Sequence, residues 1–177
     1  MTDYNHLLSR IKERDEVAFD QLYDATHEGV FAFLFAIVND RMTAEDLTQD
    51  TYMKMLTHID TFDRRSGFKT WLLAIAKHLA FDHLRRAGKT LAVDPVDGEY
   101  LFPVHNDRVE EKLMARELLS RLNSEERAIV LLKTIDNMTH RQIGQVLKKP
   151  AGTVMWLYNR AIKKMREDGK EDGHETP

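Results

Sequence analysis

The chain has 177 residues and a formal net charge of −3, with 31% charged residues, eight glycines, four prolines and no cysteine. The lack of cysteine excludes disulfide frameworks, thiolate metal sites and cysteine nucleophiles, and it fits a reducing cytoplasm. Scarce glycine and proline, with Leu, Met and Ala recurring throughout, favour an all-α protein. The length allows one domain or two small ones with a real core.

Positive charge is concentrated in two blocks. Residues 61–90 carry seven basic against two acidic side chains, and residues 119–166 carry ten against three, while the three remaining blocks are acidic. A protein that binds a polyanion gathers cations in this way, because each neutralised phosphate releases a counterion. Helical proteins also often carry uneven charge, so both interpretations stay open at this point.

The longest apolar run is VFAFLFAIV at residues 30–38, about half the length that spans a bilayer. No basic leader precedes it. We therefore expect no membrane insertion and a soluble, unprocessed, cytoplasmic chain.

Residues 43–60 are predicted to form a helix with Thr43 as its N-cap, because Asp46 stands at the third helical position. A spacing of 100° per residue predicts one buried side, made of Ala44, Thr51, Tyr52, Met55 and Ile59. The opposite side carries Asp46, Gln49, Asp50 and Met53. Taken alone, this polar stripe is typical of a solvated face.

Residues 61–89 combine cations and aromatics in a short loop followed by a helix. The loop holds Phe62, Arg64, Arg65, Phe68, Lys69 and Trp71, and one stripe of the helix holds Ala74, Lys77, His78, Phe81 and Arg85. This mixture suits single-stranded nucleic acid, since cations follow phosphates while aromatic rings receive unstacked bases. The alternative is that the aromatics close a small core, and we expect this of at least one of Phe62, Phe68 and Trp71.

The chain is predicted to divide into two helical domains. Residues 88–108 hold two prolines and two glycines without sustained periodicity and are predicted to form a flexible linker. Helical patterning covers residues 1–87 and resumes over 109–168, with helix starts predicted at Ser124 and Thr139, and 169–177 is predicted to be a disordered acidic tail.

The second domain contains a helix-turn-helix pattern. A short helix over residues 138–147 and a helix over about 151–166 flank a turn of about three residues. The angular count buries Val154, Leu157, Tyr158, Ala161 and Met165. It exposes Met155, Trp156, Asn159, Arg160, Lys163 and Arg166. Trp156 among cations indicates a partner surface, such as thymine methyls beside phosphates, unless it packs against another domain of the chain.

Three segments in this order resemble the extracytoplasmic-function (ECF) sigma factors of bacterial RNA polymerase. They are AEDLTQDTYMKML, TFDRRSGFKTWLLAIAKHLAFDHLRR and the region from LNSEERAIVLL to MTHRQIGQVLKKPAGTVMWLYNRAIKKM, and the resemblance covers about residues 5–168. It implies that the first domain (sigma region 2) binds core polymerase and melts the −10 element, and that the second (region 4) reads the −35 element.

The resemblance also implies roles for individual residues. Core-polymerase contacts fall on Asp46, Leu47, Gln49, Asp50 and Met53. Contacts to the opened −10 strand fall on Phe62, Arg64, Phe68, Lys69, Trp71, Lys77, His78, Arg85 and Arg86. Contacts to the −35 duplex fall on Arg141, Gln142, Thr153, Met155, Trp156, Asn159, Arg160 and Lys163.

The chain departs from the family pattern at several of these positions. Met155, Trp156 and Leu157 stand where Lys, Ser and Arg are usual, and the changes at Met155 and Trp156 predict a changed −35 preference. His78 stands where Asn is common, and Lys148 stands where a turn glycine is frequent.

No enzyme is expected, because the sequence has no Gly-rich phosphate loop, nucleophile elbow or HExxH motif, and neither a cofactor nor a metal is expected. The resemblance implies three partners, namely core RNA polymerase, promoter DNA and an anti-sigma factor, and a monomer when free. The main alternative is a stand-alone helix-turn-helix regulator that binds duplex DNA unaided. A third is a protein-interaction module that has lost DNA reading.

Overall fold

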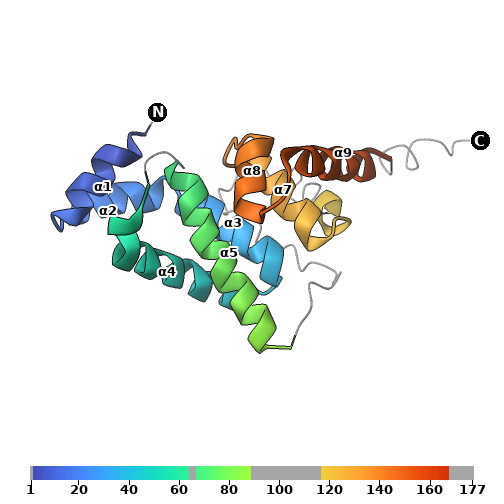
Figure 1. Ribbon diagram of the computed structural model, residues 1–177. Helices are drawn as coiled ribbons and strands as arrows, with labels where there is room; N and C mark the ends of the chain where they lie inside the picture. The colour runs from blue at the N-terminus through green and yellow to red at the C-terminus, as the bar shows by residue number, and fades with distance from the viewer. Residues whose placement is uncertain (1, 64–66, 89–116, 168–177) are drawn as a thin grey trace, which may run out of the picture.

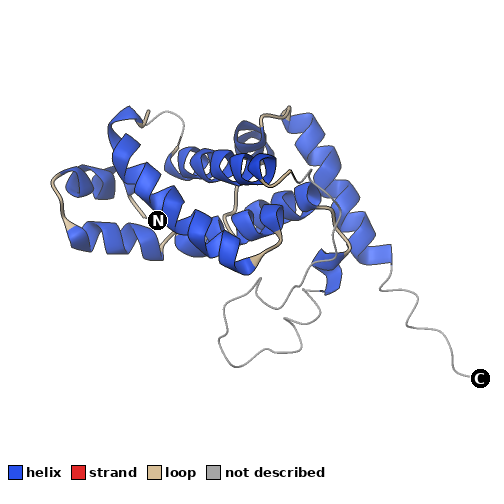
Figure 2. Cartoon of the chain, turned by 90° about the horizontal axis from the view of Figure 1, so that it is seen from below, coloured by secondary structure: helices blue, strands red, loops and turns tan. Residues whose placement is uncertain are grey.

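The computed structural model describes residues 2–63, 67–88 and 117–167. Over these residues the regular structure is entirely helical, which confirms the predicted all-α class (Figures 1 and 2). The elements are α1 (Tyr4–Lys12), α2 (Glu16–Asp24), α3 (His27–Val38), α4 (Arg41–His58), η1 (Ile59–Thr61), α5 (Phe68–Arg86), α7 (Ser124–Thr134), α8 (His140–Leu147) and α9 (Ala151–Glu167). Apart from Gly88, the predicted linker lies outside the described residues, as does the predicted tail.

Helix α3 runs through the middle of the molecule (Figure 1) and contains the apolar run noted in the sequence. It packs against α4 and α5 within the N-terminal half and against α7 of the C-terminal half. Helices on several sides leave α3 no wide solvent-facing stripe, and Phe33, Leu34 and Phe35 are all buried in sequence. A helix that is apolar all round is therefore a core helix here.

The N-cap of α4 lies three residues earlier than predicted, so the assignment of Thr43 as N-cap was wrong. Asp40 is the N-cap, and its carboxylate accepts a hydrogen bond of 2.8 Å from the backbone N–H of Thr43. Both residue types are good caps, and a carboxylate adds a favourable charge at the positive end of the helix. The helix ends at His58, and the 3-10 turn η1 follows it.

In the C-terminal half, the cap of one helix was predicted correctly, and the cap of another was placed one residue too late. Asn123, not Ser124, caps α7, and it forms a capping box with Glu126. Thr139 caps α8 and forms the predicted capping box with Gln142. Ser124 is instead the first helical residue, because the amide of Asn123 reaches the N–H of Glu126 at 2.8 Å.

The helix-turn-helix is confirmed in α8 and α9. Lys148 ends α8 in the left-handed conformation, with φ of 55°. Gly144 permits the tight approach of the turn, because a Cβ atom there would lie 2.5 Å from the carbonyl oxygen of Lys149. Helix α9 then starts at Ala151, directly after Pro150, as the sequence predicts.

The two halves of the chain pack against each other through α3 with α7 and through α5 with α8. Polar contacts between described residues also cross this junction. Lys69 of α5 forms an ion pair of 2.6 Å with Asp136, and Arg127 of α7 donates to the carbonyl oxygen of Ala36 at 3.4 Å. In this structure the buried core is continuous between the halves.

Candidate nucleic-acid interface

The outer face of α4 is exposed as the helical periodicity predicts. Asp46, Gln49 and Asp50 are exposed, and Met53 keeps 63% of its surface in solvent. The predicted inner face is confirmed, since all five of its members are buried, namely Ala44, Thr51, Tyr52, Met55 and Ile59. Acidic, amide and apolar side chains thus share one accessible surface, which we call the α4 surface (Asp46, Gln49, Asp50 and Met53).

Leu47 requires a correction. It is one of the implied polymerase contacts, but its side chain is 6% exposed and belongs to the core. The reason lies in the same periodicity, because Leu47 is one turn away from Ala44 and Thr51 on the inner side. In this structure Leu47 supports the α4 surface from behind.

Tyr52 fixes the orientation of α4 on the bundle. Its hydroxyl and the hydroxyl of Thr26 share a buried hydrogen bond of 2.8 Å, and its ring lies 4.7 Å from that of Tyr23. Burial raises the pKa of the Tyr52 phenol well above its ordinary value. The phenol therefore stays neutral, and it locks the rotation of α4 that presents the α4 surface.

The aromatic side chains of Phe62, Phe68 and Trp71 pack on one another. Phe62 lies 5.2 Å from Trp71 and 6.0 Å from Phe68 between ring centroids, and Phe68 also stacks on Tyr4 at 5.1 Å. Phe68 is buried, so it closes the core and presents no ring for base stacking in this arrangement. Phe62 and Trp71 are half-buried. Arg64 lies outside the described residues.

The cations of α5 differ in their surroundings. Lys69 is held by Asp136 in the ion pair described above and is partly buried. Lys77 lies over the ring of Phe81, 5.4 Å from its centroid. Burial lowers the pKa of Lys77, and the nearby cations Lys148 and Lys149 lower it further.

The remaining members of the predicted −10 face are exposed. His78 and Arg86 lie in solvent, and Arg85 forms a surface ion pair of 2.7 Å with Asp82 on the same helix. The basic face of α5 is therefore accessible at His78, Arg85 and Arg86 and partly covered at Lys69 and Lys77.

Helix α9 presents the predicted outward face. Val154, Leu157 and Ala161 are buried against the rest of the C-terminal half, and Tyr158 and Met165 are partly buried. The expectation that Trp156 faces outward is confirmed, because 58% of its surface is exposed, and Met155 is 50% exposed. The other exposed residues of the predicted −35 surface are Arg141, Thr153, Asn159 and Lys163, while Gln142 is half-buried by its capping role.

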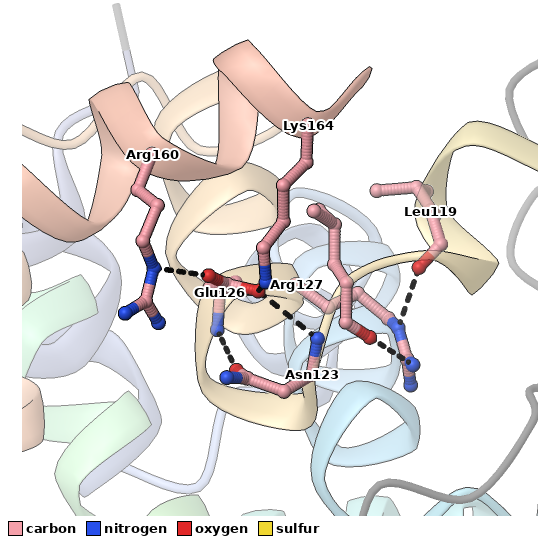
Figure 3. A network of polar contacts seen from close by, with 7 residues as sticks. Leu119, Asn123, Glu126, Arg127, Arg160 and Lys164 are labelled. Carbon is pink, nitrogen blue, oxygen red and sulfur yellow. Dashed lines mark hydrogen bonds and ion pairs between the residues drawn. The ribbon is translucent and has the colours of Figure 1, made fainter. Parts of the chain in front are cut away.

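Glu126 connects α7 to α9 and was not identified from the sequence (Figure 3). Its carboxylate is fully buried and accepts from Arg160 Nε at 2.7 Å, from Lys164 Nζ at 2.8 Å and from the backbone N–H of Asn123 at 3.2 Å. Burial alone would raise its pKa, but these donors outweigh burial and lower the pKa below its ordinary value. The ionised carboxylate thus holds two cations of α9.

Arg160 also contacts Trp156. Its guanidinium carbon lies 4.5 Å from the centroid of the indole ring, within the range of a cation–π interaction. Arg160 therefore lies between a buried anion and an exposed aromatic ring. The capping-box spacing from Asn123 to Glu126 could have revealed the cap. The partners of Glu126 on α9, however, are 34 and 38 residues away and leave no local signal in the sequence.

Arg127 is a second buried charge that sequence reasoning missed. It is 2% exposed, and its guanidinium donates to the carbonyl oxygens of Leu119, Leu122 and Ala36. Burial lowers its pKa to about 10. These carbonyls lie at the start of the C-terminal half and on α3, so Arg127 ties α7 to both. An arginine in a helical pattern gives no sequence signal for such burial.

Within the described ranges, no group of three His, Asp or Glu residues could hold a metal ion. In the same ranges, no helix is both long and apolar enough to cross a membrane.

The fold and the two exposed faces define an all-α helix-turn-helix protein with a second helical unit at its N-terminal side. Family models for Sigma-70 region 2 and Sigma-70, region 4 match residues 22–90 and 112–165. The ECF RNA polymerase sigma factor SigX of Bacillus subtilis is 31% identical over 165 residues, which cover 86% of this chain and 84% of SigX. The chain belongs to the ECF family of RNA polymerase sigma factors.

Other similarities agree with this assignment. The ECF sigma factor SigW of Bacillus subtilis is 25% identical over 174 residues, covering 90% of this chain and 93% of SigW. Two solved structures share the fold at 21% identity. They are the sigma factor RpoE of Bartonella quintana with the anti-sigma factor NepR, with a TM-score of 0.68 over 87% of this chain and 98% of RpoE, and CnrH with the cytosolic domain of CnrY, with a TM-score of 0.66 over 94% of this chain and 97% of CnrH.

Proposed function

We propose that this sigma factor directs promoter-specific initiation with its two halves in separate roles. The N-terminal half binds core RNA polymerase and melts the −10 element, and the α8–α9 pair reads the −35 element. The observation that carries this proposal is the ordered match of region 2 and region 4 to the two halves. The two accessible surfaces described above fall one in each matched region.

The α4 surface is the proposed polymerase contact. Its support is the exposure of Asp46, Gln49, Asp50 and Met53 on a helix whose opposite side is locked into the core. An exposed methionine flanked by carboxylates offers apolar contact together with charge-based specificity. Leu47 contributes indirectly, by keeping this face in register.

The basic face of α5 with Phe62 and Trp71 is the proposed −10 contact. Half-buried rings beside exposed cations can receive a flipped base while the cations follow the phosphates. Lys69 joins this surface only when it leaves Asp136. His78, Arg85 and Arg86 are accessible without any rearrangement.

The outward face of α9 is the proposed −35 contact. A helix-turn-helix places the N-terminal part of its second helix against base edges, which here puts Thr153, Met155 and Trp156 nearest to the bases. Arg141, Asn159 and Lys163 lie on the exposed surface around them, where phosphates would be expected. Gln142 and Arg160 belong to this surface, although each has an internal hydrogen-bond partner.

The remaining proposals follow from this role. The chain acts without catalysis or a cofactor of its own, works in the cytoplasm and is monomeric when free. Both similar structures are complexes with a second protein, which for the sigma factor RpoE of Bartonella quintana is the anti-sigma factor NepR and for CnrH is the cytosolic domain of CnrY. We extend such a partner to this chain. The stand-alone regulator is not favoured, because it gives no reason for a Sigma-70 region 2 match.

Reversing one charge on the α4 surface tests the polymerase contact. Asp50→Arg replaces an exposed carboxylate by a cation and should abolish co-purification with core RNA polymerase. The fold should be kept, because surface changes of this kind stay within about 0.5 kcal/mol in stability.

The matched control is Asp20→Arg, which makes the same charge change at an exposed position of α2. It should leave polymerase binding intact. If both variants co-purify equally with core RNA polymerase and their thermal unfolding is unchanged, the α4 surface is not the polymerase contact. Run-off transcription with core enzyme over a promoter library then tests initiation itself.

A further inference from the structure

The recognition helix carries two large apolar side chains where a DNA-reading helix is expected to carry polar ones. Met155 and Trp156 are exposed, on the same side as Asn159 and Lys163. In the major groove, polar side chains read the donors and acceptors of base edges. Met155 and Trp156 must therefore contact an apolar group or have a role other than reading bases.

Two cations of the same helix, Arg160 and Lys164, could contact DNA in place of these apolar side chains, but both are bound to Glu126. Glu126 binds the side chains of both Arg160 and Lys164 through separate carboxylate oxygens, at 2.7 and 2.8 Å (Figure 3). A buried carboxylate needs cationic partners to compensate its charge, so loss of Arg160 would leave Lys164 as the only cation of this pair on Glu126 and weaken that compensation. Arg160 is thus hindered from making the bidentate guanine contact for which arginine is suited.

Arg160 instead supports the tryptophan. With Nε bound to Glu126, the guanidinium lies 4.5 Å from the centroid of the Trp156 ring. The contact restricts the rotation of an otherwise exposed side chain, so the indole is held ready before any ligand arrives. Glu126, Arg160 and Trp156 form a chain of contacts that runs from the core to the surface.

Resting on the proposed −35 function, we propose that Trp156 reads the C5 methyl group of a thymine in the −35 element, and that Arg160 and Glu126 are positioning residues for it. The thymine methyl is the one apolar feature that a base pair presents in the major groove, so it is the natural partner of an indole. Asn159 and Lys163, which are exposed on the same helix, suit phosphates and sugars rather than an apolar protein surface.

The test removes the methyl group alone. Holoenzyme first selects a promoter from a library, and each −35 thymine of that promoter is then replaced by 2′-deoxyuridine. Wild-type holoenzyme should bind about four-fold more weakly at one position, the ratio that one buried methyl supplies. Trp156→Ala should bind thymine and deoxyuridine equally there.

Lys163→Ala is the matched control on the same face. It should weaken binding to every promoter alike and keep the four-fold ratio between thymine and deoxyuridine. Loss of the ratio in this control as well would overturn the assignment to Trp156, because the effect would then belong to the whole interface.

Glu126→Gln tests the positioning role. Once released from Glu126, Arg160 and Lys164 can reach phosphates, so the slope of log affinity against log salt should steepen by about 0.9 for each cation that does so. The thymine ratio should fall toward one. A residue with a merely structural role would lower affinity while leaving both readouts unchanged. If circular dichroism shows that this variant is unfolded, Arg160→Gln replaces it, since Lys164 still satisfies Glu126, and only the thymine ratio is then read.

Two outcomes overturn the inference and leave the sigma-factor role in place. One is wild-type binding that is insensitive to deoxyuridine at every −35 position. The other is an unchanged promoter preference in Trp156→Ala together with loss of binding to a protein such as an anti-sigma factor, which would make the indole a protein contact. Failure to initiate at any promoter would instead contradict the proposed function.

Discussion

Lys148 adopts a backbone conformation that is unfavourable for any residue with a Cβ atom. It has a positive φ of 55° at the end of α8, and an L-residue in this left-handed conformation costs roughly 1–2 kcal/mol. Its side chain also adds to the positive field that lowers the pKa of Lys77. Glycine is frequent at this position in the family, and the positive φ explains that preference.

Lys148→Gly is expected to stabilise the protein by about 1 kcal/mol, because glycine adopts positive φ without steric penalty, although it loses more entropy on folding. Denaturant unfolding measures the change. Lys148→Ala removes the same charge but keeps the strained φ, so it should give little or no gain. Equal gains in both variants would show that charge, not backbone conformation, decides the stability at this position.

At the scale of elements, the α7–α9 pair depends on a buried ionised carboxylate. The pKa of Glu126 in the folded protein is below its ordinary value of 4.5, so between these two values the unfolded chain binds more protons than the folded one. The stabilisation from Glu126 is therefore complete above about pH 4.5 and is lost as the pH falls toward the folded-state value.

Urea unfolding between pH 3 and pH 6 tests this prediction. Other carboxylates also titrate there, among them Asp15, whose pKa is lowered by its hydrogen bond from Arg10, so the comparison with Glu126→Gln is the informative one. The stability difference between wild type and Glu126→Gln should narrow as the pH falls below about 4.5. A stability difference that stays constant with pH would mean that the shape of the Glu126 side chain, and not its charge, stabilises the α7–α9 pair.

At the scale of the whole molecule, the contact between the halves includes one close approach of backbone to side chain. A Cβ atom on Gly29 of α3 would lie 2.4 Å from a carboxylate oxygen of Asp136. Asp136 is 7% exposed and is held by Lys69, so it has little room to withdraw. The close approach of α3 to the turn between α7 and α8 therefore needs glycine at this position.

Gly29→Ala should destabilise the described arrangement, although alanine in a helix interior ordinarily gains about 1 kcal/mol over glycine. Gly152→Ala is the control, because an added Cβ there meets nothing within 4 Å, and it should be neutral or stabilising. Thermal unfolding of both variants reports the sign. A gain in stability for Gly29→Ala equal to that of the control would mean that the halves do not pack in this way in solution.

The sequence by itself determined the features that depend on neighbours along the chain. Helical class, the buried sides of α4 and α9, the capping box of α8 and the outward face of Trp156 all follow from the 3.6-residue period and from cap chemistry, which act over a few residues. The start of α4 did not follow from local sequence alone, since Asp40 and Thr43 both cap well and lie within one turn of each other.

Tertiary structure decided which partner each charged side chain takes. Lys69 was predicted to contact nucleic acid, but its carboxylate partner is 67 residues away, and the buried Arg127 donates to a carbonyl 91 residues away. Glu126 likewise finds both of its cations on a helix that packs across it. Such pairings depend on how distant helices pack, and helical periodicity specifies which side of a helix is buried but not what lies opposite.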